Sequence, residues 1–495
     1  MRRDLAIGMC LIALGGCVTG PSNVPQRVTD AELRRTIAVL AGDEFEGRAP
    51  GTLGEEKTTA YLAERFAAAG LVNGARGSRP YLDPVPLVRV ERGEDRISLL
   101  PAAGKRVDLG ADDAFAATRA DRIAIEDAAL VFAGYGVDAR GELLTDLRGK
   151  VVVLLGQEPP FLGPEHADRR QASRRERELL QAGALAVLGL TNGPDAMKRG
   201  RAFHDFRRRL RWVGDDERWD VRGGVMEPRL SALLAQAGMD LSVLRAAAER
   251  PGFRPVALPF RISIAQRNRL VPFTSHNVVG KIPGRRPDGR AVVAMAHWDH
   301  LGLCAPVTAP DRICNGAVDN ASGVAALLAI AERTRRLRPE RDVWFVATTA
   351  EEQALQGAYA FAADPPLPLR SIIAGLNLDT IAVGPRGAAV GIVAPKGSSL
   401  EPVVYKATLQ LGRPWSAAED ARAFVSRQDG WAFVQRGVPF IMAGGSFTDA
   451  DRLNRFLRGP YHGPDDELTD ALDLGGAAED AELHVELVRR LAKRD

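Results

Sequence analysis

The sequence is poor in the features that mark several specialised classes of protein. Its 495 residues contain only four cysteines, too few for a disulfide-dense scaffold. Lys and Arg number 66 against 63 Asp and Glu, and a net charge of +3 over this length gives no support for a nucleic-acid-binding face. Beyond the amino terminus, no apolar run approaches the roughly 20 residues of a membrane-spanning helix. With 45% hydrophobic and 26% charged residues, the composition is that of a globular protein of about two to four domains.

The first residues have the pattern of an export signal. Arg2 and Arg3 precede an apolar run, 5–16, of about a dozen residues, which is too short to span a membrane. The run ends at Cys17 in Leu-Gly-Gly-Cys, which resembles the bacterial lipobox, whose Cys is diacylated and becomes the first mature residue. Because Val18 follows, rather than Asp, we expect a body anchored to the outer membrane and facing the periplasm. A plain secretory signal with an incidental Cys is the alternative.

Helical and strand-like patterns divide the rest of the chain. Apolar periodicity predicts amphipathic helices at 29–42 and 55–69. The stretch 123–264 has strand-like runs of its own and is expected to form a separate β-rich module. After Asn277, short apolar runs alternate with helical patterns, as in a parallel sheet covered by helices. Strands are expected at 291–296, 343–348, 372–378, 389–393 and 438–442, with a helix at 323–337.

These patterns predict an α/β fold in which helices sandwich a mostly parallel central sheet. The expected parts are the signal at 1–17, an N-terminal part of the main domain at 18–122, the inserted module at 123–264 and the rest of the main domain at 265–495. No repeat of solenoid period interrupts this organisation.

Histidines and carboxylates follow the predicted strands. The carboxyl ends of parallel strands line one crevice, so these groups are expected to meet there although they are far apart in the sequence. Imidazole with carboxylate suits zinc, although manganese or cobalt can be accommodated. The candidate site residues are His297, Asp299, Asp319, Glu351, Glu352, Asp379, Tyr461 and His462.

The number of carboxylates predicts a site for two ions. Asp319 is the expected bridge, because one carboxylate can hold two ions roughly 3.5 to 4 Å apart. His297 and Asp379 would serve one ion, and Glu352 and His462 the other.

Three further residues are expected to act on the reaction or on the ligands. Glu351, next to a ligand, is the expected general base. Asp299 is placed to accept a hydrogen bond from the second nitrogen of the His297 imidazole. Tyr461 could donate to an oxyanion.

Five motifs carry a resemblance to a known family. They are 296–302 (AHWDHLG), 316–323 (GAVDNASG), 349–352 (TAEE), 377–379 (NLD) and 461–466 (YHGPDD). In order and spacing they resemble the co-catalytic zinc aminopeptidase family that also includes glutamate carboxypeptidases. The likeness extends to 43–48 (DEFEGR), and 123–264 resembles the protease-associated domain inserted in many members. The resemblance implies two zinc ions per chain and a zinc-exopeptidase-like fold.

The chain departs from the family pattern in one place. Relatives commonly have Ser-Asp-His or a similar triplet where this chain has Gln428-Asp429-Gly430. Because that segment usually shapes substrate access, the change bears on specificity more than on hydrolysis.

The remaining cysteines and histidines are expected to stand outside the metal site. Cys304 and Cys314 bracket a short loop between the first ligand and the bridge, and in an oxidising periplasm a disulfide between them would restrain that loop. His166, His204, His276 and His484 are expected at the surface, and His300 stands near the site without an assigned role.

The expected function is that of a zinc metallopeptidase that removes N-terminal residues from peptides. The resemblance implies that Glu351 and Asp379 hold the free amine of the substrate. An acidic-residue carboxypeptidase or a dipeptidase is the closer alternative, and Arg422, Arg427 and Arg458 could contact a substrate carboxylate. A glutaminyl cyclase and a non-catalytic ectodomain are the more distant alternatives. Side-chain preference, native metal and oligomeric state stay open.

Overall fold

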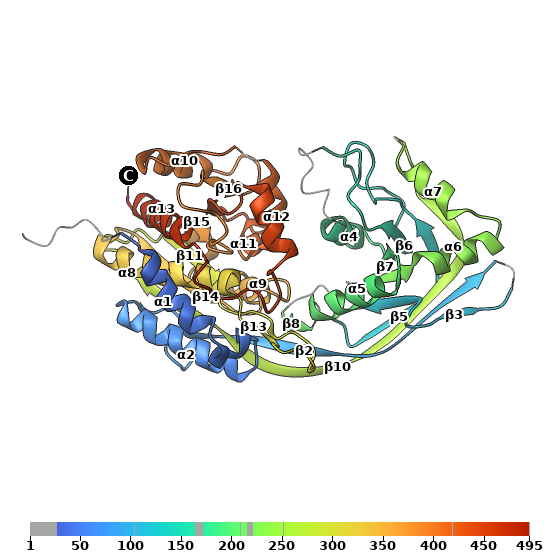
Figure 1. The fold of residues 1–495 in the computed structure, drawn as a ribbon, viewed down its shortest axis with the longest axis horizontal. Helices are drawn as coiled ribbons and strands as arrows, with labels where there is room; N and C mark the ends of the chain where they lie inside the picture. The colour runs from blue at the N-terminus through green and yellow to red at the C-terminus, as the bar shows by residue number, and fades with distance from the viewer. Residues whose placement is uncertain are drawn as a thin grey trace, which may run out of the picture.

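The computed structural model describes residues 27–102, 104–163, 172–207, 209–214, 221–250, 252–417 and 419–494. The predicted signal and Cys17 lie outside these residues, so lipidation stays a prediction. Two lobes are joined by a pair of long antiparallel strands, β2 (Leu82–Pro101) and β10 (Val256–Ile282) (Figure 1). Within the described residues, no helix combines the length and apolar character needed to cross a bilayer.

The first lobe is built on the predicted parallel sheet. Its strand order is β16-β17-β15-β11-β14-β10, in which β14, β11, β15 and β17 run parallel and the two outer neighbours, β16 and β10, run antiparallel. The bounds are β11 Ala291–His297, β14 Asp342–Thr348, β15 Ile372–Asn377, β16 Gly391–Val393 and β17 Phe440–Gly444. The expected α/β architecture is confirmed, and the last two strands begin two residues later than predicted.

Apolar side chains cover both faces of this sheet. Along β11, Val292 and Ala294 belong to the apolar cluster on one face, whereas Val293 and Met295 belong to the cluster on the other. Because successive side chains of a strand point to opposite faces, a strand buried on both sides must be apolar at every position. This explains why the central strands read as short, continuous apolar runs in the sequence.

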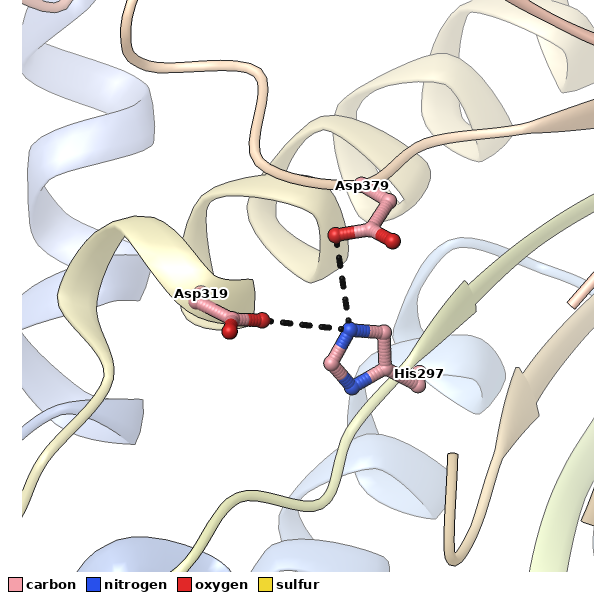
Figure 2. A group of neighbouring side chains, drawn as sticks. All are labelled: His297, Asp319 and Asp379. Atoms are coloured by element: carbon pink, nitrogen blue, oxygen red, sulfur yellow. Dashed lines mark ion pairs between the residues drawn. The ribbon is translucent and has the colours of Figure 1, made fainter. Parts of the chain in front are cut away.

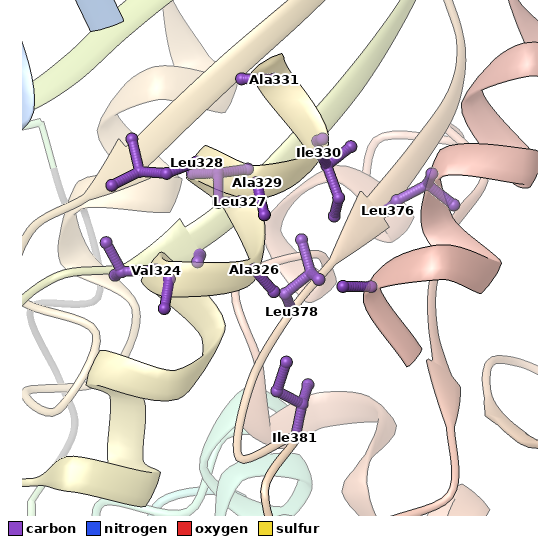
Figure 3. Packing of buried hydrophobic residues seen from close by; sticks show 14 of the residues in the cluster. Val324, Ala326, Leu327, Leu328, Ala329, Ile330, Ala331, Leu376, Leu378 and Ile381 are labelled. Atoms are coloured by element: carbon purple, nitrogen blue, oxygen red, sulfur yellow. The ribbon is translucent and has the colours of Figure 1, made fainter. Parts of the chain in front are cut away.

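Helices supply the apolar partners of both faces (Figure 1). One face packs against α1 (Asp30–Leu40), α2 (Leu53–Ala68), α8 (Ser322–Leu337), α10 (Glu401–Gln410) and α13 (Gly475–Leu491). The other face packs against α9 (Gln356–Ala363) and α11 (Trp431–Val434). Figure 3 shows the apolar side of α8, including Leu327 and Ile330, beside Leu376 and Leu378. This packing fixes the strand ends that carry the candidate site.

The second lobe has its own hydrophobic core. Its strands are β3 (Val107–Leu109), β4 (Ala114–Ala117), β5 (Arg122–Phe132), β6 (Lys150–Leu155), β7 (Ala186–Thr191) and β9 (Arg222–Met226), and its helices are α4 (Ala172–Gln181), α5 (Pro194–Arg207), α6 (Glu227–Gln236) and α7 (Leu241–Ala248). The core includes Ile97 and Ala114, upstream of the predicted boundary at 123. Both that boundary and the assignment as a protease-associated domain stay predictions.

The expectation that His484 lies at the surface is wrong. His484 is 1% exposed on α13, and its Nδ1 lies 2.7 Å from the Asp480 carbonyl oxygen. Helices α1, α8 and α10 and strand β17 all contact α13, so the helix is buried nearly all round and its polar residues turn inward with its apolar ones. Burial lowers the pKa of His484 to about 4.

We predict that His484→Leu makes the protein less sensitive to acid. The folded state protonates His484 near pH 4, whereas the unfolded chain does so near pH 6.5, so wild-type stability falls as the pH drops between these values. The loss is about 3 kcal/mol, and the variant should lack it. Urea unfolding of both metal-free proteins at pH 7.5 and pH 4.5 measures the difference. Equal acid losses in the two proteins would contradict the prediction.

Candidate metal centre

Three parallel strands deliver the candidate ligands to one edge of the sheet. His297 is the last residue of β11, Glu352 lies four residues beyond β14, and Asp379 lies two residues beyond β15. Asp319 lies in the kinked turn that precedes α8. All four side chains are buried or nearly so. The side chains that were expected to meet at the carboxyl ends of the parallel strands therefore lie close together in the fold.

Asp319 lies between two histidines. His297 Nε2 lies 3.3 Å from Asp319 Oδ1 and 3.5 Å from Asp379 Oδ1 (Figure 2). On the other side, His462 Nε2 lies 3.3 Å from Asp319 Oδ2. The two oxygens of one carboxylate thus face two different imidazoles.

Glu352 is also shared by two histidines. His462 Nε2 lies 3.0 Å from Glu352 Oε2, and His300 Nδ1 lies 2.8 Å from Glu352 Oε1. His300 is completely buried, and each histidine contacts a different oxygen of the Glu352 carboxylate. No role was assigned to His300 from the sequence, because no local pattern shows that Glu352 packs against it.

Two polar side chains hold the turn that carries Asp319. Asp466 accepts hydrogen bonds from the backbone N–H groups of Val318 (2.9 Å) and Asp319 (3.0 Å). Asn320 follows a cis peptide bond, and its Nδ2 donates to the Leu378 carbonyl at 3.0 Å. Asn320 therefore ties the Asp319 turn to the strand end that presents Asp379, a contact between segments that no local sequence pattern reveals.

Asp299 acts on the neighbouring glutamates more than on the imidazole. The prediction that its carboxylate would accept from His297 needs correction, because the nearer acceptor is the carbonyl oxygen of Asp299, 3.1 Å from His297 Nδ1, with the carboxylate at 3.8 Å. The carboxylate instead accepts from the N–H of Glu351 (3.0 Å) and Glu352 (3.3 Å). It orients the turn that carries both.

Burial and crowded charges shift the pKa values in this site. Desolvation raises the pKa of Glu351 well above its usual range, and Glu352 and Asp379 add to the rise. Desolvation works against the charged form of His462, but Glu352 and Asp319 outweigh it and raise the pKa of His462 to about 10. The site therefore concentrates negative charge that attracts protons or cations.

The donor set fits a pair of divalent cations. One group that could hold an ion consists of His297, Asp319 and Asp379, and a second consists of His300, Asp319 and Glu352, each with ligand atoms within 4.8 Å of one another. Asp319 belongs to both groups. In the second group His462 could replace His300 as the ligand, because His462 Nε2 faces the carboxylates of both Asp319 and Glu352.

The site lies on the floor of a cleft of about 910 Å³ between the lobes. The first lobe lines it with Glu351, Asp379 and Tyr461, and the second lobe with Glu176 of α4 and Phe203 of α5 among others. The Tyr461 ring stacks on His462 with centroids 3.7 Å apart. Burial and the carboxylates of the site raise the pKa of Tyr461 well above its usual range, so its phenol keeps its proton. A cleft of this size accepts a short, extended ligand.

Comparison with known proteins identifies the segment that holds this site. Residues 277–488 match the family model described as peptidase family M28. This segment is therefore similar to the M28 peptidases. It contains every candidate ligand and the candidate base, and a metallopeptidase is what the sequence predicted.

Individual relatives match parts of the chain. A probable zinc metalloprotease of Pyricularia oryzae is 29% identical over 227 residues, which cover 44% of this chain and 43% of that protein. A vacuolar membrane protease of Schizophyllum commune is 34% identical over 124 residues, 25% of this chain and 12% of that protein. The chain thus spans less than half the length of either relative. A solved aminopeptidase from Aneurinibacillus sp. strain AM-1 shares the fold over 96% of both chains, with a TM-score of 0.54 and 18% identity.

Two features border the candidate metal centre. Asp429, in the segment that departs from the family pattern, is completely buried and accepts a hydrogen bond from Thr348 Oγ1, while Gln428 beside it lines the cleft. Cys304 and Cys314 are joined by a disulfide with Cα atoms 5.8 Å apart, the pairing expected from the sequence. The disulfide closes the loop between β12 (Gly302–Leu303) and β13 (Ile313–Cys314).

We predict that Asp466→Ala destabilises the first lobe by about 3 kcal/mol, because it leaves two buried N–H groups without an acceptor. Asp465→Ala is the matched control: Asp465 is adjacent but exposed, and its loss should change the free energy of unfolding by less than about 0.5 kcal/mol. Urea unfolding of the metal-free variants measures both. Similar values for the two variants would show that Asp466 does not hold the Asp319 turn.

Proposed function

We propose that this chain is a two-zinc aminopeptidase that hydrolyses the N-terminal residue from peptides. The observation that carries the proposal is the position of Asp319, whose two oxygens each lie 3.3 Å from a different histidine. A carboxylate placed in this way can bridge two cations. His297 and Asp379 would complete the protein ligands of one ion, and Glu352 and His462 those of the other. His300 would then orient Glu352 from outside the ligand set.

When bound, the ions would supply the Lewis acidity that polarises the scissile carbonyl and makes water a nucleophile at neutral pH. Side chains of the protein would then transfer the proton and donate the hydrogen bonds that the reaction needs. Glu351, on the cleft wall, would take a proton on its carboxylate and pass it to the leaving amine. Tyr461 keeps its phenolic proton and would donate a hydrogen bond to the developing oxyanion.

Carboxylates on the cleft wall beside the proposed ions favour a substrate amine over a substrate carboxylate at this end of the cleft. Glu351 and Asp379 both line the cleft beside His297 and would accept hydrogen bonds from a protonated N-terminus. Every unblocked peptide carries a free amine at its N-terminus. A site that binds this amine beside the proposed ions would make the protein an exopeptidase that acts at the N-terminus.

One observation favours a second candidate, a peptidase that recognises the substrate carboxylate. Of the three arginines considered from the sequence, Arg427 alone is among the residues that line the cleft, where its side chain is exposed and its guanidinium lies 5.1 Å from the Phe424 ring centroid. Arg427 could pair with a C-terminal carboxylate and so convert the same centre to a carboxypeptidase or dipeptidase.

A substrate panel separates these functions. We expect aminoacyl-chromophore substrates with a free amine to be hydrolysed, N-acetylated forms of the same substrates to be inert, and a chelator to abolish activity that added zinc restores. Peptides with a blocked N-terminus and a free C-terminus serve as the test of the second candidate. Release from those peptides alone would contradict the aminopeptidase, and full activity of metal-stripped protein would contradict the metal mechanism.

A second measurement tests the base. We expect Glu351→Gln to bind zinc as wild type does, because Glu351 is not a proposed ligand, and to lose about 10³-fold in kcat, because the amide cannot accept the proton. Glu486→Gln is the control, since Glu486 is a buried glutamate paired with Arg489 and Arg490 on α13, away from the cleft. Its kcat should match that of wild type. Loss of zinc from Glu351→Gln in proportion to its activity would show that Glu351 is a ligand.

A further inference from the structure

The segment 43–48 resembles a family motif but has no role in the site as described so far. It forms a short helical turn, η1 (Asp43–Arg48), that packs on the disulfide-closed loop. Gly47 has φ +63°, and a Cβ at this position would lie 2.4 Å from the Cys314 carbonyl oxygen. Only glycine allows the backbone of η1 to come this close to the loop between the first ligand and Asp319.

Arg48 ends this turn, and its guanidinium reaches across to both ligand-bearing segments. Its hydrogen bonds go to main-chain carbonyl oxygens: Nη1 to Leu40 and Asn315 at 2.6 Å, Nε to Trp298 at 2.8 Å and Nη2 to Gly316 at 3.1 Å. Within the described residues, no carboxylate accepts a hydrogen bond from this guanidinium. Arg48 thus binds main-chain carbonyl groups and not an acidic side chain.

The carbonyl groups that Arg48 binds are next to proposed ligands. Trp298 directly follows His297, and Gly316 begins the turn that leads to Asp319. A planar guanidinium presents its donors in fixed directions, so it sets the distance between the segments that it joins. A lysine ammonium is a single centre on a flexible stem and cannot reproduce this fork.

The charge of Arg48 also suits the place it occupies. The side chain is 1% exposed, and burial lowers its pKa to about 10 against the opposing effect of Asp466 and Asp319, so it remains a cation at neutral pH. A fixed positive charge therefore lies under a site rich in carboxylates and opposes their mutual repulsion.

We propose that Arg48 is a positioning residue that sets the spacing of His297 and Asp319 and thereby prepares the site to take up a divalent cation. The proposal rests on the proposed metal centre and adds to it a residue 249 positions before the first ligand in the sequence. Arg48 touches neither ligand side chain, so its effect on the ions is exerted through the backbone of the two segments.

Zinc affinity of the metal-free full-length protein tests this role. We expect Arg48→Lys to weaken zinc binding about 10- to 100-fold in competition with a chromophoric chelator. Arg341→Lys is the matched control, because Arg341 is also buried and donates to the Leu491 carbonyl at 3.1 Å, far from the site in the fold. It should lower the melting temperature while its zinc affinity stays within about twofold of wild type.

The outcomes separate this proposal from the proposed function. Wild-type zinc affinity in a folded Arg48→Lys variant would overturn the positioning role alone, whatever its melting temperature. A wild-type chain that binds no zinc would overturn the metal centre and the positioning role together. If Arg48→Lys does not fold, Asp43→Ala tests the contact of η1 with the same residue, because exposed Asp43 accepts from Asn315 Nδ2 at 2.7 Å while Arg48 donates to the Asn315 carbonyl oxygen. A loss of a few-fold in zinc affinity supports the proposal, and unchanged affinity overturns it.

Discussion

The structure depends on holding one carboxylate, Asp319, with its two oxygens directed at different histidines. Free rotation of the turn that carries it would destroy this arrangement, and the fold prevents rotation from several directions. Asp466 binds the N–H groups at the turn, Asn320 ties it to the next strand end, and Arg48 holds its beginning. Carboxylates gathered in a buried place repel one another, so the site stays assembled before any ion arrives only because these hydrogen bonds hold the turn and the positive charge of Arg48 opposes the repulsion.

The sheet makes such precision attainable. Central strands that are apolar on both faces are packed from both sides, which leaves their ends few alternative positions. His297 and Asp379 come from adjacent strands in that sheet, so their separation follows from the spacing of parallel strands and not from the conformation of a flexible loop. The loops contribute the other proposed ligands, Glu352 and His462, which lie beyond the ends of the strands.

Much of this could be predicted from the sequence, because the fold and the ligands leave local signals. Continuous apolar runs such as 291–296 predict strands that are buried on both faces. A His or Asp that directly follows such a run is therefore predicted to lie at the end of the strand. The contacts of Arg48, Asp466 and His300 leave no such signal, since each depends on which distant segment packs against it. His484 was misplaced for the same reason: its burial comes from the neighbours of α13, which the periodicity of one helix cannot reveal.

The two long strands between the lobes have a mechanical consequence. Strands β2 and β10 are hydrogen-bonded to each other along nearly the whole distance from one hydrophobic core to the other. The walls of the cleft are therefore connected by a continuous ladder, not by a pair of loose linkers, and widening the cleft means flexing that ladder. A register break between Gln266 and Asn268 is a weak point along it. Elsewhere the paired strands resist bending, so the distance between the two walls changes little. This limits the width of the ligands that the cleft can accept.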